Sequence, residues 1–397
     1  MIPVSLDLAD PGAYPGSGPL RPPAIVAPAP RQVSFGRVSG HVSRGTAYVL
    51  VKVNGVVRAR GAPAAGRFRF DVALPPRDCR VQVVAVGALG DRRSRTVSQV
   101  FGLPRRARPT GPRRTSEDAA LARTVRALVR GYPGIGAAYV EDLRSRRGAA
   151  WNARARFPAA STVKVAIALE VLRTLRGPPA AGSSLDRLLR SMLVYSDNAA
   201  ANALLTWIGG STSGGASRVN ETLHALGIWE TYMYGGYVLG TAAARPIPLR
   251  VDEQPAIGIG KYTTAHDLAR LHRAVYLAAG GRGPATGLPG AFTSADARFL
   301  MWILAHVADP GKLDRYLPDG VPVLHKAGWI LQARHDAGIV FWEGGAYVAV
   351  VMTWHGAGVG PSSDVLAGRV AAASLKRYRQ LSRVARASTA DDSSSTA

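Results

Sequence analysis

The period of the apolar pattern changes once along this chain, near residue 116, and the change limits the chain to two differently built parts. Before it, apolar and polar residues alternate in short runs such as residues 48–53, which is the period of a half-buried strand. After it, Leu121, Val125 and Val129 recur at the spacing of one helix face. A chain of 397 residues is also too long for one ordinary domain. We therefore predict two domains.

The first domain is predicted to be a small all-β sandwich over residues 31–103. Its clearest element is a hairpin in which Asn54-Gly55 joins two strands, because this pair favours two-residue hairpin turns. Several short strands at this spacing resemble bacterial immunoglobulin-like modules. The flanking segments are rich in Pro with Gly and Ala, or with Arg. We expect a disordered lead-in at 1–30 and a Pro/Arg linker at 104–116.

The second domain is expected over residues 117–384, followed by a disordered tail at 385–397. Ser116 is predicted to cap the first helix, which Gly131 and Pro133 end. Two strands, a long helical insertion, three strands and a closing helix predict an antiparallel sheet flanked by helices. The expected strands are 136–140, 148–151, 326–329, 338–341 and 347–353, the helices dominate 161–308, and the last helix covers 363–381.

The positive charge of the chain does not point to nucleic acid. Of 50 basic residues only six are lysines, the arginines are spread along the chain, and no nucleic-acid-binding motif occurs. Residues 1–116 carry 19 Lys and Arg against 5 Asp and Glu, a net charge of +14 out of +24. This concentration outside the second domain favours docking of the first domain onto anionic cell-envelope polymers.

Metal and cofactor chemistry is not expected. Cys79 is the only cysteine, and the eight histidines show no ligand spacing such as H-E-x-x-H. The first residues show no secretory signal, and no apolar run reaches the roughly 20 residues that span a bilayer. The protein is thus expected to be either cytoplasmic or a mature or mis-started form of a secreted one.

The first chemical motif is Ser161-Thr162-Val163-Lys164, at the start of an apolar helix. This spacing places the Ser161 hydroxyl and the Lys164 amine on the same side of a helical turn. A serine hydroxyl needs an adjacent base to act as a nucleophile, and the helix N-terminus offers free N–H groups to a developing oxyanion. Taken alone, the motif fits a capping serine with a chance lysine better than a catalytic pair.

Two further motifs change that balance. Ser196-Asp197-Asn198 precedes a second helix, and Lys326-Ala327-Gly328 begins a late strand. Two of the six lysines thus fall within the motifs. A lysine acts as a base near neutral pH only if its pKa is lowered, and a second ammonium group nearby lowers it.

The order S-x-x-K, S-D-N, K-[T/S]-G resembles the signature of the serine β-lactamases and penicillin-binding proteins, and the chain is nearest to class A over about 117–380. The resemblance implies a nucleophile, its base, a hydroxyl that relays a proton, and a residue that holds the substrate amide; these are Ser161, Lys164, Ser196 and Asn198. It implies a buried, structural Asp197, a Lys326 that attracts a substrate carboxylate, and a substrate-binding strand of Lys326, Ala327, Gly328 and Trp329. The N–H groups of Ser161 and Trp329 would form the oxyanion hole.

The sequence departs from that pattern in two places. Class A enzymes carry an E-x-x-L-N loop whose glutamate activates the deacylating water, and here neither Glu230 nor Glu253 lies in such a loop. Glu230 is expected to be a surface residue. Ala327 stands where the family has a hydroxyl that helps to bind the substrate carboxylate, so that carboxylate recognition is expected either to be weaker or to be supplied by Arg334 or His335.

These observations predict a monomeric, extracytoplasmic serine hydrolase without a cofactor, which forms an acyl-enzyme with β-lactams or with D-alanyl peptides of peptidoglycan. Three alternatives stay open. The protein is a β-lactamase, a penicillin-binding D,D-peptidase or esterase, or a non-catalytic wall-binding or β-lactam-sensing protein.

Overall fold

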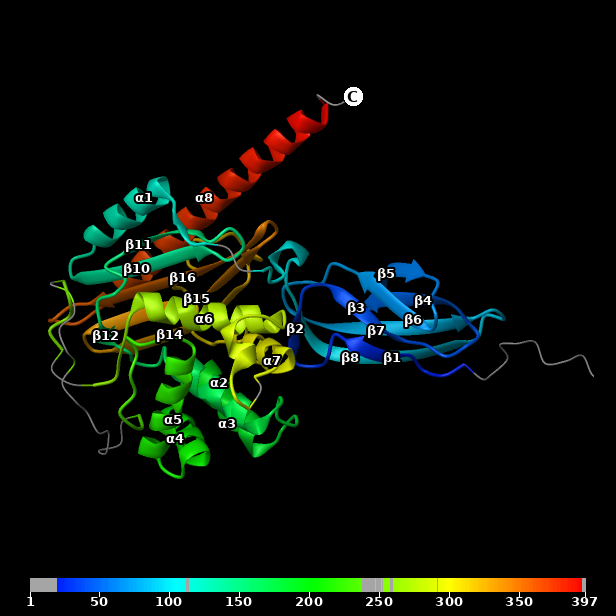
Figure 1. The fold of residues 1–397 in the computed structure, drawn as a ribbon, viewed down its shortest axis with the longest axis horizontal. Coiled ribbons are helices and arrows are strands. Elements are labelled where there is room, and N and C mark those ends of the chain that lie inside the picture. Colours follow the sequence, from blue (N-terminus) through cyan, green and yellow to red (C-terminus); the bar gives the residue numbers. More distant parts are fainter. Residues whose placement is uncertain are drawn as a thin grey trace, which may run out of the picture. The chain divides into compact units, whose positions relative to one another are not determined.

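The chain divides into two compact units, Met1–Gly102 and Leu103–Ala397 (Figure 1). Each unit is described by itself below. None of the described helices is both long and apolar enough to cross a membrane. The computed structural model describes residues 20–111, 114–237, 247, 251, 253–257, 260–290 and 292–394.

The first unit is built from strands in two sheets, of order β1-β3-β6 and β2-β8-β7-β4-β5. Val38 and Phe68 of the smaller sheet pack with Val49, Val51 and Val83 of the larger one, so the two sheets share one core. The strands are β1 Ala24–Ala27, β2 Gln32–Ser34, β3 Arg37–His41, β4 Thr46–Val53, β5 Val56–Gly61, β6 Arg67–Asp71, β7 Asp78–Gly87 and β8 Arg92–Gly102.

The predicted hairpin of the first unit is confirmed. Asn54 and Gly55 connect β4 to β5 with φ angles of 49° and 87°, the left-handed conformation that a tight hairpin turn needs. The prediction that residues 1–30 are a disordered lead-in is wrong for Ala24–Ala27, because these residues form β1, which pairs with β3 through Ala24 and His41. The Ala-Ile-Val-Ala run of β1 supplies apolar residues for that pairing. The immunoglobulin-like topology stays a prediction.

The second unit contains a six-stranded sheet of order β14-β15-β16-β10-β11-β9. Its neighbours are antiparallel, as predicted, except that β9 pairs with β11 in parallel. Helices α1 and α8 pack on one face and α6 on the other (Figure 1). The elements are β9 Ser116–Glu117, α1 Ala119–Arg130, β10 Ile135–Asp142, β11 Arg147–Trp151, α6 Ala265–Ala279, β14 Val323–Ile330, β15 Ala333–Trp342, β16 Gly345–Trp354 and α8 Pro361–Ser394.

Two predicted boundaries of this unit are wrong. Ser116 belongs to β9, and Asp118 caps α1 by accepting a hydrogen bond from the Leu121 N–H. A carboxylate is as good a cap as a hydroxyl, and here it is also paired with Arg377. The second error is the tail at 385–397, because α8 continues to Ser394. No proline or glycine follows Gly368 within that helix to end it.

A helical part lies between the strands of the sheet in sequence and carries the motifs. Helix α2 is buried on all sides from Lys164 to Leu172, which explains why its apolar run shows no polar face. Strand β12 pairs with β13, and the Ala159 N–H donates to the Lys261 carbonyl (2.9 Å). The remaining elements are β12 Phe157–Pro158, α2 Lys164–Leu175, α3 Ser184–Val194, α4 Asn198–Gly209, α5 Thr212–Ala225, β13 Tyr262–Thr263 and α7 Ser294–Leu304, with 3-10 helices at Arg105–Ala107 and Pro284–Gly287.

The segment expected to be a Pro/Arg linker is in part integral to the second unit. Leu103 and Ala107 are buried, and the Ala107 carbonyl accepts a hydrogen bond from the buried Tyr276 hydroxyl (2.8 Å). Apolar residues among the prolines and arginines account for this packing.

This contact predicts how far the chain can be shortened. A chain that begins at Leu103 keeps the acceptor of the Tyr276 hydroxyl, whereas one that begins at Thr115 leaves this hydroxyl buried without it. The shorter chain should lose about 1–3 kcal/mol in free energy of unfolding, measured by urea denaturation. In Tyr276→Phe chains the difference between the two lengths should shrink, because no hydroxyl is left unpaired. Equal stability of the two lengths with Tyr276 in place would contradict this role.

Candidate active site

Ser161 lies in a tight turn between β12 and α2. The Lys164 N–H donates to the Ser161 carbonyl (3.2 Å) and the Thr162 N–H to the Ala159 carbonyl (3.2 Å). The regular helix begins only at Lys164, so the serine precedes the helix that it was expected to open. Ser161 is partly exposed beside the buried Thr162, and no described residue hydrogen-bonds its hydroxyl. This turn presents a free hydroxyl to a ligand.

Gly328 brings strand β14 against this turn. A Cβ atom at this position would lie 2.7 Å from the Ser161 nitrogen and 2.9 Å from the Thr162 nitrogen, so a side chain would collide with the backbone. The Ser161 N–H has no acceptor among the described residues. The Ser161 N–H is therefore available as one donor of the expected oxyanion hole. The second donor, expected to be the Trp329 N–H, stays a prediction.

Lys164 is fully buried, and its amine contacts the S-D-N motif. Its Nζ donates to the Ser196 carbonyl (2.6 Å) and to Asn198 Oδ1 (2.7 Å), and it lies 3.5 Å from Ser196 Oγ. Ser196 adopts a φ of 59°, which turns the chain so that both its carbonyl and its hydroxyl approach the lysines. The structure thus brings together the first two motifs.

Asp197 has the structural role expected of it, although it is only half-buried. Its carboxylate caps α4 by accepting from the N–H groups of Ala199 and Ala200, and it accepts the Ser191 hydroxyl (2.8 Å). The Ser191 hydrogen bond is the main cause that lowers the pKa of Asp197. Asn198, the first residue of α4, is oriented by this cap.

Lys326 completes the group from the third motif. Its Nζ donates to Ser196 Oγ (3.1 Å) and to the Ala327 carbonyl (3.0 Å), and the side chain is buried. The Ser196 hydroxyl therefore lies between two amines, where it can pass a proton from one group to another. Ala327 is buried on the same strand and supplies no hydroxyl.

Burial is the main cause of the unusual acidity of both lysines. It lowers the pKa of Lys164 to about 7, with a further lowering by Lys326 and Lys261 that Asp197 partly opposes. The pKa of Lys326 is lowered to about 8, again mainly by burial, while Asp309 and Asp336 raise it. From the sequence we expected the second ammonium group to be the main cause of the lowered pKa of Lys164. Its effect on this pKa is smaller than that of desolvation.

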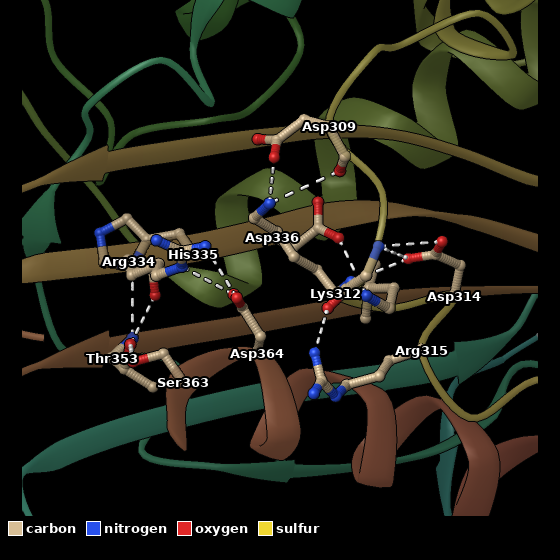
Figure 2. A network of polar contacts seen from close by, with 12 residues as sticks. Asp309, Lys312, Asp314, Arg315, Arg334, His335, Asp336, Thr353, Ser363 and Asp364 are labelled. Atoms are coloured by element: carbon tan, nitrogen blue, oxygen red, sulfur yellow. Dashed lines mark hydrogen bonds and ion pairs between the residues drawn. The ribbon is translucent and has the colours of Figure 1, made fainter. Parts of the chain in front are cut away.

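The strand that carries Lys326 rests on a network of ion pairs (Figure 2). Asp336 accepts from His325 Nδ1 (2.8 and 2.9 Å) and from the Leu313 N–H (3.1 Å). Lys312 pairs with Asp309. These contacts fix β14 against β15 and place carboxylates behind Lys326, where they stabilise its charged form.

Arg334 and His335 do not take over carboxylate recognition. Arg334 forms two 2.7 Å hydrogen bonds with Asp364 at the start of α8, as Figure 2 shows. His335 is buried, with Nε2 2.8 Å from the Pro158 carbonyl. Both side chains are committed to internal contacts, which strand register imposes and which the linear sequence does not reveal.

Two residues of the site were not predicted from the sequence, Tyr237 and Lys261. The Tyr237 ring lies against both Lys164 and Lys261, with 4.5 Å and 4.7 Å from the ring centroid to the respective Nζ atoms. Asn202 holds the Tyr237 backbone through two hydrogen bonds (2.6 and 2.8 Å). Two features of the sequence could have pointed to them. Asn202 follows Asn198 by one helical turn, and Lys261 is one of only six lysines.

Of the two glutamates considered for deacylation, Glu230 is held by another residue and Glu253 is exposed. Glu230 is bound to Arg156 (2.5 Å), and its N–H donates to Asp267, so it is not the surface residue that was expected. Its side chain is only 15% exposed. Glu253 is exposed. Among the described residues, no group of three or more His, Cys, Asp and Glu could hold a metal ion.

The second unit is similar to known proteins. Among solved structures, PBP-A gives a TM-score of 0.55 at 20% identity, covering 68% of this chain and 100% of that chain. A mutant of PBP-A described as an acyl-enzyme complex with penicillin G gives 0.52 at 20% identity, with 68% and 100% covered. An ancestral class A β-lactamase gives 0.51 at 20%, with 65% and 99% covered. At these identities the likeness shows the fold alone, and it confirms the β-lactamase-like α/β architecture.

The search of curated proteins gives no match. A model of the Beta-lactamase enzyme family matches residues 120–177 and 176–378. These ranges contain all three motifs and cover well over half of the sequence, and the chain therefore belongs to the β-lactamase enzyme family.

Proposed function

We propose that this protein is a serine acyl-enzyme former that acts on β-lactams or on D-alanyl peptides. The observation that carries the proposal is the buried Lys164 amine, one turn from Ser161 and held by Ser196 and Asn198. A lysine with a pKa of about 7 is substantially uncharged at neutral pH. It can then accept the proton of the Ser161 hydroxyl, which a charged lysine cannot.

The proposed acylation uses each motif in turn. Ser161 Oγ attacks the carbonyl carbon while its proton passes to Lys164 Nζ, and the negative oxygen is stabilised by the Ser161 N–H and by the N–H expected at Trp329. The C–N bond then breaks. The leaving nitrogen receives a proton through Ser196 Oγ, which contacts both Lys164 and Lys326. Lys326 attracts the substrate carboxylate, and Asn198 binds the substrate amide.

A slow second half-reaction favours a penicillin-binding D,D-peptidase over an efficient β-lactamase. Residues 231–251 contain no aspartate or glutamate. The ring of Tyr237 lies against Lys164 Nζ, and an aromatic ring cannot activate water as a carboxylate does. Release of the acyl group by water therefore depends on Lys164 alone. A β-lactam sensor, which would form the acyl-enzyme and not hydrolyse it, is the extreme case of this slow second half-reaction.

The first unit is proposed as an accessory domain. The net charge of +14 over residues 1–116 favours contact with anionic polymers of the cell envelope. An extracytoplasmic, monomeric protein that meets peptidoglycan stem peptides fits this role, and nucleic acid is not a proposed partner.

Ser161→Ala should abolish covalent labelling by a fluorescent penicillin. Intact-mass measurement is expected to show one adduct on the unchanged protein and none on the variant, because Ser161 is the proposed nucleophile and its hydroxyl has no hydrogen-bond partner among the described residues. Ser191→Ala is a suitable control, since that hydroxyl is bound to Asp197. An adduct that persists without Ser161 would remove the proposed nucleophile.

Lys164→Arg should lower the acylation rate by about 10²-fold or more, because arginine stays protonated and cannot act as the base. Stopped-flow labelling with the same penicillin measures the rate. Lys376→Arg, at an exposed position of α8, should leave it unchanged. Near-normal acylation by Lys164→Arg would show that another group takes the proton.

Penicillin turnover should show a burst of one product per enzyme followed by slow release, because none of the described residues hydrogen-bonds a carboxylate to Lys164 that could activate water. Acid quench within the first turnover should trap the ester, and mass spectrometry should detect it. Glu230→Gln should change the lifetime of the ester little, because Glu230 is bound to Arg156. Rapid steady-state hydrolysis without a burst would instead establish an efficient β-lactamase.

A further inference from the structure

Three of the six lysines of the chain meet at this site, and the proposed mechanism uses only two of them. Lys261 is the third. Its Nζ lies 4.7 Å from the centroid of the Tyr237 ring, against which Lys164 Nζ also lies, at 4.5 Å. The separation of the two amines cannot exceed the sum of these distances. Lys261 is thus close enough to act on Lys164 through its charge.

The position of Lys261 is fixed by a short series of backbone contacts. Its Nζ donates to the Gly236 carbonyl, and its own carbonyl accepts the Ala159 N–H just before the nucleophile turn. A Cβ at Gly236 would lie 2.6 Å from Asn202 Oδ1. The absence of a side chain there lets Asn202 hold the Tyr237 backbone and so position the ring that both lysines contact.

Three charged groups among the described residues shift the pKa of Lys164. Lys326 and Lys261 disfavour its charged form, and Asp197 favours it. The Asp197 carboxylate accepts hydrogen bonds from Ser191 and from two N–H groups of α4. The Tyr237 ring attracts cations, and the amines of Lys164 and Lys261 both lie against it. Its hydroxyl is buried without a hydrogen-bond partner among the described residues.

We propose that Lys261, seated on Tyr237, is a positioning residue that keeps Lys164 uncharged and so ready to accept the Ser161 proton. The inference rests on the proposed acyl-enzyme function. An uncharged Lys164 amine donates two hydrogens, to the Ser196 carbonyl and to Asn198 Oδ1, and keeps its lone pair for the Ser161 proton. Lys261 supplies positive charge near Lys164, and its Nζ contacts the Gly236 carbonyl and the Tyr237 ring, not the reacting atoms.

The test is the pH dependence of acylation. Acylation should rise as Lys164 loses its proton, through a pKa of about 7. Removing the charge in Lys261→Gln raises the pKa of Lys164, so the acid limb moves to higher pH. At pH 6 the acylation rate should fall about three- to tenfold, with little change once Lys164 is uncharged in both proteins.

Three variants control for structural damage. Lys261→Arg keeps the cation over the ring and should restore the original profile. Tyr237→Phe keeps the ring and should leave the acid limb in place. Lys376→Gln removes a charge from exposed α8 surface and should have no effect. An unmoved acid limb in Lys261→Gln, or an equal movement in Lys261→Arg, would overturn the proposal.

A second measurement separates this inference from the proposed function. The chain has only six lysines, so the Lys164 side-chain nitrogen can be followed by NMR in ¹⁵N-lysine-labelled protein. Its titration should move to higher pH in Lys261→Gln, whether or not the protein reacts with penicillin. Failure of the unchanged protein to form an adduct would overturn the acyl-enzyme function alone, whereas an unmoved Lys164 titration would overturn the role of Lys261.

Discussion

The burial of the Lys164 amine is the constraint on which the site depends. An ammonium group in an apolar interior is costly, and the chain reduces this cost by letting the amine lose its proton at a pKa of about 7. The uncharged amine still needs hydrogen-bond acceptors, and the Ser196 carbonyl and Asn198 Oδ1 provide them. Stability and chemistry therefore impose the same requirement, because the proton state that a buried lysine prefers is also the one that makes it a base.

The site also requires the helical part and the sheet to meet at one point. Helix α2 follows Ser161, while Lys326 comes from β14 at the edge of the sheet, and Gly328 lets that strand approach the Ser161 N–H to a distance that no side chain permits. The ion pairs behind β14 hold the strand in this position. Lys326 consequently reaches Ser196 Oγ, which also lies near Lys164, although Lys326 and Ser196 are 130 residues apart in the sequence.

Local patterns predicted much of this structure. The Asn54-Gly55 turn, the central strands and the apolar helix after Ser161 follow from period and turn chemistry, and the three motifs predicted the meeting of Lys164, Ser196 and Lys326. Sequence reasoning failed where a partner lies far along the chain. Asp118 caps α1 while paired with the distant Arg377, and Arg334 turns to Asp364 because of its strand register. Lys261 and Tyr237 have no local pattern of their own.

Tyr237 affects acylation of Ser161 and hydrolysis of the ester differently from a carboxylate in the same place. A glutamate beside Lys164 would activate water, but its negative charge would also stabilise the ammonium form of that lysine. The aromatic ring, which Lys164 shares with Lys261, gives Lys164 less of this stabilisation than a carboxylate would. In the proposed mechanism, the same side chain therefore favours an uncharged Lys164 for attack by Ser161 and provides no carboxylate to activate water at the ester. Readiness for acylation and slow hydrolysis would then have one physical cause, an aromatic ring in place of a carboxylate against Lys164.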